Sequence, residues 1–440
     1  MRRLRLVAPF AVMLLIAAAC TSDEGGGDEP SASGSPAGED TGNVNILSAV
    51  EPEEAEAVQE VLDAEVNPDV EYQAEIEASG NFEEQLQIRA EGGTLDIALL
   101  PQPGSVPAQA AAGTAIALED LGFDIDELTA TFGESFMALG EYEGKHYGLP
   151  TNINLKSMVW YPKDDFDAAG YEVPTTWDEL MALSDQIAAD GSTPWCVGFK
   201  SEGSSGWPAT DWVEDIVLRT AGPDVYEQWW KHEIPFNDPQ IVAAVEQFGD
   251  VMFREGYVLG GPENTPSVEF GDAPGPMFEN PPKCWLHRQA SFINAFFPAD
   301  AESGVDYDWF PLPPIDQEGT LYAGEMAIVG RDAPEVRDFL NRFIGVDVQC
   351  GMGGITAASR ISPNVKVGPE CYANDILAEA SEILSTASTS GTGGFDASDL
   401  MPPEVGQGSF WTGMLQYMQE GPDSLQSIMD EIEASWPAQE

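Results

Sequence analysis

Hydrophobic and polar positions alternate along the chain with two spacings, one typical of buried strands and one typical of amphipathic helices. The segment 44–50 (VNILSAV) is nearly continuous in apolar residues and predicts a buried strand. Directly after it, Ala55, Val58, Val61 and Leu62 share one helical face, which predicts a helix that buries one side. Because this alternation of strand and helix continues along the chain, the pattern predicts an α/β fold with helices packed on sheets.

Further segments carry the same two signals. Strands are expected at 70–76, 94–104, 290–298, 307–313 and 321–330, and a helix closed by glycine is expected at 81–93. Thr176 to Glu179 has the form of a capping box, and Asp238 followed by Pro239 has the form of another helix start. The last third of the sequence is expected to be mostly helical.

The segment 204–222 (SSGWPATDWVEDIVLRTAG) combines two tryptophans with a helix start. A helix with Pro208 in its first turn places Trp207 and Asp211 on one side, and its apolar face consists of Val213, Ile216, Val217 and Thr220. We interpret Trp212 as a core residue of this helix. A sugar needs an aromatic ring for its C–H face and fixed polar partners for its hydroxyls, so Trp207 and Asp211 form a candidate sugar site. The alternative is that Asp211 is only a favourable charge near a helix N-terminus.

The first 42 residues predict export. A basic head precedes an apolar run at 6–19, which is shorter than the roughly 20 residues of a membrane-spanning helix and is typical of a secretory signal. The run ends in IAAAC, which resembles the lipobox of bacterial lipoproteins. We therefore expect a lipoprotein signal peptide at 1–19, a lipid on Cys20 and a disordered tether at 20–42, with an ordinary signal peptide cut elsewhere as the alternative.

The charge balance limits the partners. Lys and Arg number 18 and Asp and Glu number 76, which gives a formal net charge of −58. Such a chain does not attract nucleic acid or an anionic ligand, and a solvated acidic surface is the simplest explanation of the charge. The three histidines are scattered, so neither a metal site nor a cofactor is expected.

Four cysteines follow Cys20, and in an exported chain they suggest two disulfides with three pairings to choose from. We favour Cys350–Cys371, because these residues are close in sequence, and Cys196–Cys284, each of which lies beside a tryptophan.

The motifs of nucleotide-binding enzymes and of serine hydrolases are absent from the sequence, so no catalytic residue and no enzyme activity are expected. A glycosidase's pair of carboxylates cannot be recognised among so many acids, which leaves a lipoprotein glycosidase as an alternative.

Four longer motifs carry a resemblance to a known family: GWPATDWVEDIVLRTAG (206–222), HEIPFNDP (232–239), FGDAPGPMFENPPKCWLHRQASF (270–292) and ITAASRISPN (355–364). They resemble family 1 extracellular solute-binding proteins of ABC importers, and among these the α-glucoside-binding group. The resemblance implies two α/β lobes joined by a hinge and closing on a sugar. We expect a first lobe of 43–152 plus 289–330, a second lobe of 153–288 plus 331–440, and crossings near 151–154, 289–292 and Gly330.

The resemblance also extends the list of candidate ligand-binding residues. It places Trp207 and Asp211 in a loop that faces the cleft, and it makes Trp411, in GSFWTGM, a second sugar platform or else a core tryptophan. Arg360 can donate a planar fork to hydroxyls, or form a salt bridge on an acid-rich surface. Weaker candidates are Gln102, Phe292 and Glu51 or Glu53, together with Glu325, which stands where the family pattern leads us to expect an aspartate.

The function implied by this resemblance is capture of a neutral oligosaccharide, such as an α-glucoside, and its delivery to the permease of an ABC importer. We expect a monomer held at the outer face of the cell membrane by the lipid on Cys20. The first alternative is a receptor for a quaternary ammonium osmolyte, held in an aromatic cage by cation–π attraction. The second is the lipoprotein glycosidase.

Overall fold

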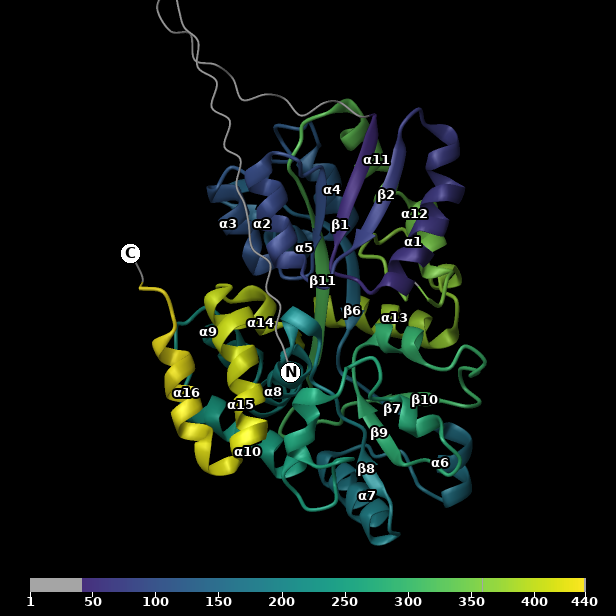
Figure 1. Cartoon of the computed structure of the whole chain (residues 1–440), viewed down its shortest axis with the longest axis vertical. Coiled ribbons are helices and arrows are strands. Elements are labelled where there is room, and N and C mark those ends of the chain that lie inside the picture. Colours follow the sequence, from purple (N-terminus) through teal and green to yellow (C-terminus); the bar gives the residue numbers. More distant parts are fainter. Residues whose placement is uncertain (1–41, 358, 439–440) are drawn as a thin grey trace, which may run out of the picture. The chain divides into compact units, whose positions relative to one another are not determined.

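The computed structural model describes residues 42–357 and 359–438. The expected signal peptide, the lipidated Cys20 and nearly all of the expected tether lie outside this range. Figure 1 shows the fold, which contains two main sheets. Within the described residues, no helix has the length and the apolar composition needed to cross a membrane.

The first sheet has six strands, and three of them at one end run parallel. The strands are β1 (Asn43–Ser48), β2 (Gln73–Ala78), β3 (Ile97–Leu100), β6 (Leu149–Leu155), β11 (Thr320–Val329) and β12 (Gly393–Phe395). Their order is β12-β11-β3-β1-β2, and β6 pairs with β11 as well. Strands β2 and β3 run parallel to β1 on its two sides, so the loops that follow these three strands leave the sheet at the same edge.

Helix α1 (Pro52–Glu65) covers this sheet with the face that the sequence predicts, since Ala55, Val58, Val61 and Leu62 are all buried. Helices α11 (Pro334–Phe343) and α12 (Val346–Gly353) contribute side chains to the same hydrophobic core. Figure 1 shows these two helices near β1 and β2.

The second sheet has four strands in the order β10-β7-β9-β8. They are β7 (Met158–Tyr161), β8 (Thr193–Trp195), β9 (Cys284–Arg288) and β10 (Asp308–Pro311). The chain leaves the first sheet after Leu155 and enters the second at Met158, so only Lys156 and Ser157 separate the two sheets here. One hydrophobic core lies mainly on the first sheet and another mainly on the second, while a third takes residues from both β6 and β7. This arrangement agrees with the expected α/β fold with two lobes.

The remaining elements are helices and one short hairpin. The hairpin joins β4 (Glu141–Tyr142) to β5 (Lys145–His146). The other helices are α2 (Phe82–Gly92), α3 (Val106–Ala111), α4 (Ile125–Phe132), α5 (Glu134–Ala138), α6 (Lys163–Ala169), α7 (Trp177–Ala189), α8 (Trp207–Thr220), α9 (Pro223–Trp230), α10 (Pro239–Met252), α13 (Asp375–Ser390), α14 (Ala397–Leu400), α15 (Trp411–Glu420) and α16 (Leu425–Ala434).

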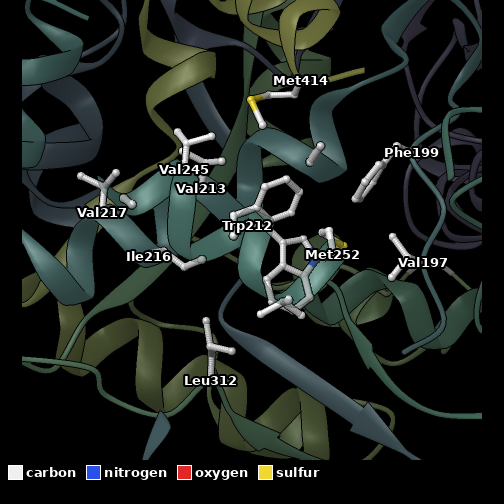
Figure 2. Packing of buried hydrophobic residues seen from close by; sticks show 14 of the residues in the cluster. Val197, Phe199, Trp212, Val213, Ile216, Val217, Val245, Met252, Leu312 and Met414 are labelled. Atoms are coloured by element: carbon white, nitrogen blue, oxygen red, sulfur yellow. The ribbon is translucent and has the colours of Figure 1, made fainter. Parts of the chain in front are cut away.

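Helix α8 begins as the sequence predicts and is buried along nearly its whole length. Gly206 precedes it with φ of 113°, and a Cβ on Gly206 would lie 2.4 Å from the carbonyl oxygen of Trp411, so only glycine fits here. Figure 2 shows the packing around Trp212, which lies among Val213, Val245 and other apolar side chains. The interpretation of Trp212 as a core residue is confirmed, because only 2% of its surface is exposed.

Both expected disulfides are present. Cys196 is bonded to Cys284, with 5.4 Å between their Cα atoms, and Cys350 is bonded to Cys371, with 4.8 Å between theirs. The first bridge joins the end of β8 to the start of β9, and the second ties α12 to the turn before α13. The pairings favoured from sequence are therefore confirmed.

Three expectations from the sequence are wrong. The apolar segment 290–298 forms a 3-10 helix at Ser291–Phe296 and no strand, because its aromatic side chains gather on one cluster instead of alternating between two faces. The expected lobe boundaries also fail in two places. Strand β10 pairs with β7 in the second sheet, and α11 and α12 bury their apolar faces in the core of the first sheet. An amphipathic pattern shows that a helix has a buried face, but it does not show which sheet covers it.

Candidate functional site

A small cavity lies where the parallel strands of the first sheet end. The loops after β1 and β3 contribute Glu51 and Gln102 to its lining, and the first turn of α2, which follows β2, contributes Glu83. Ligands of open α/β sheets bind outside the carboxyl ends of the strands, which makes this edge the expected place for a site. We call this cavity, of about 170 Å³, the inner cavity.

A second hollow of about 430 Å³, which we call the outer cavity, continues from the inner one. The two share lining residues, namely Glu51, Glu54, Ser201, Phe270 and Phe296. Glu51 is half-buried near other acids of the outer cavity. Burial raises the pKa of Glu51, and repulsion by Glu202, Glu53 and Glu269 raises it further.

A larger hollow lies elsewhere and has the character of a surface groove. This α7–α10 groove, of about 1050 Å³, runs between α7, α10 and α15. Its charged lining residues, Asp178, Glu246, Asp250, Arg254 and Asp423, are exposed to water. It therefore lacks the desolvated polar groups that fix the orientation of a ligand, and the inner cavity is the better candidate site.

Aromatic side chains form one wall of the inner cavity. Trp207 lies at the N-terminus of α8 and packs edge-on against Phe270, with 5.1 Å between ring centres. Phe292, from the 3-10 helix at 291–296, lies 5.9 Å from the Trp207 ring, and Phe296 lies 5.2 Å from Phe270. All four rings line the inner cavity. Trp207, Phe292 and Phe296 remain partly exposed, while Phe270 is buried behind them, so the wall offers an apolar surface to a ligand.

Polar side chains from the first sheet complete the lining. Asn152 and Asn154 lie on β6, Glu325 lies on β11, and Gln102 follows β3. The Oδ1 atom of Asn154 is buried, and no donor reaches it among residues 42–357 and 359–438. A buried acceptor without a donor costs free energy, so a ligand that brings a hydroxyl here gains affinity.

Lys156 lies under the aromatic wall. Its ammonium is 5.2 Å from the centre of the Trp207 ring, 2.9 Å from Asp211 Oδ1, and also bonded to Asp396. Although burial opposes it, attraction by Asp211 and Asp396 raises the pKa of Lys156, so the ammonium stays charged. Two carboxylates thus occupy two of its three donors and hold the charge beside the ring of Trp207.

Asp211 is completely buried and is not among the residues that line the inner cavity. Its Oδ1 accepts from Lys156, and its Oδ2 lies 3.3 Å from Nη1 of Arg288, so both oxygens face cations. The expectation that Asp211 contacts the ligand directly is therefore not met. Asp211 positions Lys156, and Lys156 contacts Trp207, so the two residues paired from sequence are connected through a third.

Arg360 lies behind two carboxylates of the lining. It is 2% exposed, it donates to Glu54 Oε1 at 2.8 Å, and it forms an ion pair with Glu325. Burial raises the pKa of Glu54 to about 7, and the arginine opposes this rise. Of the two interpretations given from sequence, the salt bridge is therefore the one observed, although it is buried. Arg360 orients Glu54 and Glu325, and it is not among the residues that line the inner cavity.

The other candidates divide into those that line a cavity and those that do not. Trp207, Gln102, Phe292, Glu325 and Glu51 line the inner cavity, and Glu53 lines the outer one. Trp411 is 3% exposed and its Nε1 donates to Ser398 at 3.3 Å, so the core interpretation applies. The short helix ahead of α15 turns the Trp411 ring toward α14 and away from the cavity.

Sequence reasoning missed several lining residues. They are Glu54, Glu83, Asn152, Asn154, Lys156, Phe270, Phe296 and Asp399. Two of them had a usable signal in the sequence, because Phe270 and Phe296 belong to or adjoin the motif 270–292. Lys156 had only its rarity, since the chain has 18 basic residues among 440.

Comparisons with known proteins agree with this architecture. The family model for bacterial extracellular solute-binding proteins matches residues 49–349. The alpha-glucosides-binding periplasmic protein AglE of Rhizobium meliloti is 39% identical over 372 residues, which cover 82% of this chain and 79% of AglE. The osmoprotective compounds-binding protein GgtB of Synechocystis sp. is 35% identical over 435 residues, which cover 98% of this chain and 99% of GgtB.

A solved structure shows the same fold at low sequence identity. The bacterial solute receptor AcbH, reported to prefer β-D-galactopyranose exclusively, superposes with a TM-score of 0.76 at 19% identity. The similarity covers 89% of this chain and 97% of AcbH. Together with the family match over 49–349, these relatives decide the classification, and this chain belongs to the bacterial extracellular solute-binding protein family.

Proposed function

We propose that this protein captures a neutral oligosaccharide with an α-linked glucose unit and delivers it to the permease of an ABC importer. The observation that carries the proposal is the composition of the inner cavity, where a wall of four aromatic rings faces amide and carboxyl groups from the first sheet. This pairing matches the two surfaces of a sugar, an apolar C–H face and an edge of hydroxyls. The names of AglE and of its sugar-binding relatives support the α-glucoside class.

Delivery of the sugar to the permease requires that the protein is exported and that its two lobes close around the sugar. The lipid on Cys20 anchors the protein at the outer face of the membrane, and residues 20–42 serve as the tether. The protein acts as a monomer and performs no reaction, because its task is to bury the sugar between the lobes and present a closed surface to the permease. The family membership supports this mechanism, and so does the lining of the inner cavity, which combines strands of the first sheet with the start of α8 and the 3-10 helix at 291–296.

The alternative class of ligand is a quaternary ammonium osmolyte. The name of GgtB, an osmoprotective compounds-binding protein, is consistent with this alternative. A cation of this kind requires a free aromatic face. The ring of Trp207 already has the ammonium of Lys156 at 5.2 Å, so a second cation on this ring would meet a like charge. The site therefore favours a neutral ligand, and an osmoprotective ligand of this protein is expected to be a neutral glycoside.

Replacing Trp207 with alanine should weaken binding of an α-linked disaccharide about ten- to hundredfold, because the ring that carries the sugar face is lost. This range corresponds to about 1.4–2.8 kcal/mol at 25 °C. Calorimetric titration with maltose, trehalose and sucrose measures the change. Trp207→Phe should recover part of the affinity.

Trp230→Ala is the matched control, because Trp230 is also partly buried and also has a lysine ammonium, that of Lys231, at 5.2 Å from its ring. It lies on α9, away from the cavity, and its loss should leave affinity unchanged. A thermal-shift panel should show stabilisation by the disaccharides and none by betaine or choline. Stabilisation by the ammonium compounds alone, or turnover of an aryl glucoside, would refute the proposed function.

A further inference from the structure

We propose that Asp399 serves the ligand as a neutral carboxylic acid, so that the protein binds its saccharide most tightly in the protonated state and loses affinity as the pH rises. The inference rests on the proposed function and adds to it a binding residue with a defined protonation state. It follows from a group of buried charges beneath the cavity, which we call the buried charge cluster. Its members are Lys156, Arg219, Arg288, Asp211, Glu214, Asp215, Asp396 and Asp399.

The ion pairs of this cluster account for all of its cations. Lys156 pairs with Asp211 and Asp396. Arg288 and Arg219 both pair with Asp215, and Arg288 also reaches Asp211. Three cations thus balance three carboxylates, namely Asp211, Asp215 and Asp396.

Two acids are left over. Within the described part of the chain, neither Glu214 nor Asp399 has a cation within ion-pair distance, and their exposed fractions are 0% and 6%. An unpaired buried carboxylate is too costly to stay ionised and takes up a proton instead. Burial raises the pKa of both groups well above the ordinary range, and repulsion by Asp396 raises both further.

Asp396 is the acid of the cluster that stays ionised next to Glu214 and Asp399. Although burial opposes it, the ammonium of Lys156 and the hydroxyl of Ser398 lower the pKa of Asp396 to about 2. The backbone N–H of Asp399 donates to the same carboxylate at 3.0 Å. With Asp396 fixed in the ionised form, the neighbouring Glu214 and Asp399 hold protons. Burial also raises the pKa of Asp211, to about 7, although Lys156 and Arg288 oppose this rise.

Only one of these two neutral acids reaches the ligand site. Asp399 lines the inner cavity together with Gln102. Glu214 instead accepts from the backbone N–H of Ala397 at 2.7 Å and is not part of the lining. A neutral carboxyl group can donate to a sugar oxygen and accept from a sugar hydroxyl, whereas a carboxylate can only accept.

The ionisable surroundings of Asp399 come from several elements. Asp211 and Glu214 come from α8, Lys156 from the link between β6 and β7, and Tyr226 from α9, where its hydroxyl contacts Glu214. The segments Pro103–Ser105 and β12 carry no ionisable side chain. Three further acids nearby are exposed to water, namely Asp224 and Glu227 of α9 and Glu404 of the segment Glu404–Phe410. Burial, together with repulsion by Asp396 and Asp211, therefore raises the pKa of Asp399, while Lys156 opposes the rise.

The sign of the pH effect follows from linkage. When the ligand binds the protonated form alone, the dissociation constant is constant below the pKa of Asp399 and rises above it, toward tenfold for each pH unit. Binding above that pKa also takes up close to one proton for each ligand bound.

The test is calorimetric titration of the full chain with maltose, or with the disaccharide of the panel that binds most tightly, from about pH 5 to pH 9 at constant salt. We expect affinity to fall as pH rises, and Asp399→Asn to bind nearly as well as the parent at low pH, because its amide always donates. The pH dependence of this variant should be much weaker than that of the parent, and what remains comes from Glu54, which also lines the cavity and whose pKa burial raises to about 7. Glu214→Gln is the matched control, since it removes the other neutral acid, and it should keep the parent's pH profile.

Titration of the parent in two buffers with different ionisation heats gives a second readout that needs no variant. Proton uptake that grows with pH supports the inference. Saccharide binding that is independent of pH, or an Asp399→Asn variant as pH-dependent as the parent, overturns it and leaves the proposed function intact. If no saccharide binds at any pH, the proposed function and the inference fall together.

Discussion

Replacing Lys156 with methionine should lower the free energy of unfolding by about 3–5 kcal/mol, because removing one partner of a buried ion pair leaves its other partner uncompensated. Asp211 and Asp396 would both lose their bond to the ammonium while remaining completely or almost completely buried. Denaturant unfolding monitored by tryptophan fluorescence measures the change.

The pH dependence of this loss distinguishes charge from packing. Carboxylates without a cation have raised pKa values in the folded variant, so protonation at lower pH should restore part of the stability, and the defect should grow as the pH rises. Lys366→Met is the control, because Lys366 is exposed and its replacement should change stability by less than about 0.5 kcal/mol. A loss below 1 kcal/mol for Lys156→Met would show that the cluster is not held together by this lysine.

Replacing Trp212 with alanine should cost about 3–5 kcal/mol of stability, the range for truncating a fully buried tryptophan. Trp212 is 2% exposed, and its ring lies 5.0 Å from that of Trp195 in the core shown in Figure 2. Because Trp212 does not line the inner cavity, the folded fraction of the variant should bind the disaccharide with the affinity of the parent.

Trp212→Phe is the matched variant, since it keeps an aromatic ring and should lose less stability. The two tryptophans of one helix therefore give opposite results, because Trp207→Ala weakens binding while Trp212→Ala weakens the fold. A Trp212→Ala variant that is as stable as the parent, or that folds but does not bind, would contradict this division.

The elements that the sequence predicts well are those whose pattern is local. The strand at 44–50, the helix face with Val58 and Leu62, and the start of α8 at Pro208 all follow from spacing and capping chemistry. The segment 290–298 fails because aromatic residues favour both strands and irregular aromatic clusters. Its rings pack into a cluster beside the cavity, and no local rule reveals that preference.

The site was predicted in part, and the failures have one cause. The polar face of α8, with Asp211, Asp215 and Arg219 four positions apart, is typical of a face turned to solvent or to a ligand. The structure buries this face against Lys156 and Arg288, which come from the β6–β7 link and from β9. Which charges meet inside a protein depends on contacts between distant segments, so spacing along one helix cannot reveal it.

Arg360 is a second residue whose partners come from distant segments and could not be inferred from the local sequence. The sequence left two interpretations of Arg360 open, a donor to hydroxyls or a salt bridge, and the structure shows ion pairs with Glu54 of α1 and Glu325 of β11. Glu325 is the position where the resemblance leads us to expect an aspartate. Its longer side chain reaches Arg360 and still lines the inner cavity, so the departure from the family pattern is accommodated by the arginine behind it.

The most direct test of the account is a crystal structure of the protein grown with a saturating α-linked disaccharide. We expect the sugar in the inner cavity, with one ring against the face of Trp207 and its hydroxyls within hydrogen-bond distance of Asn154 and Asp399. A sugar seated in the α7–α10 groove, or one bound in the inner cavity without contact to Trp207, would contradict the account.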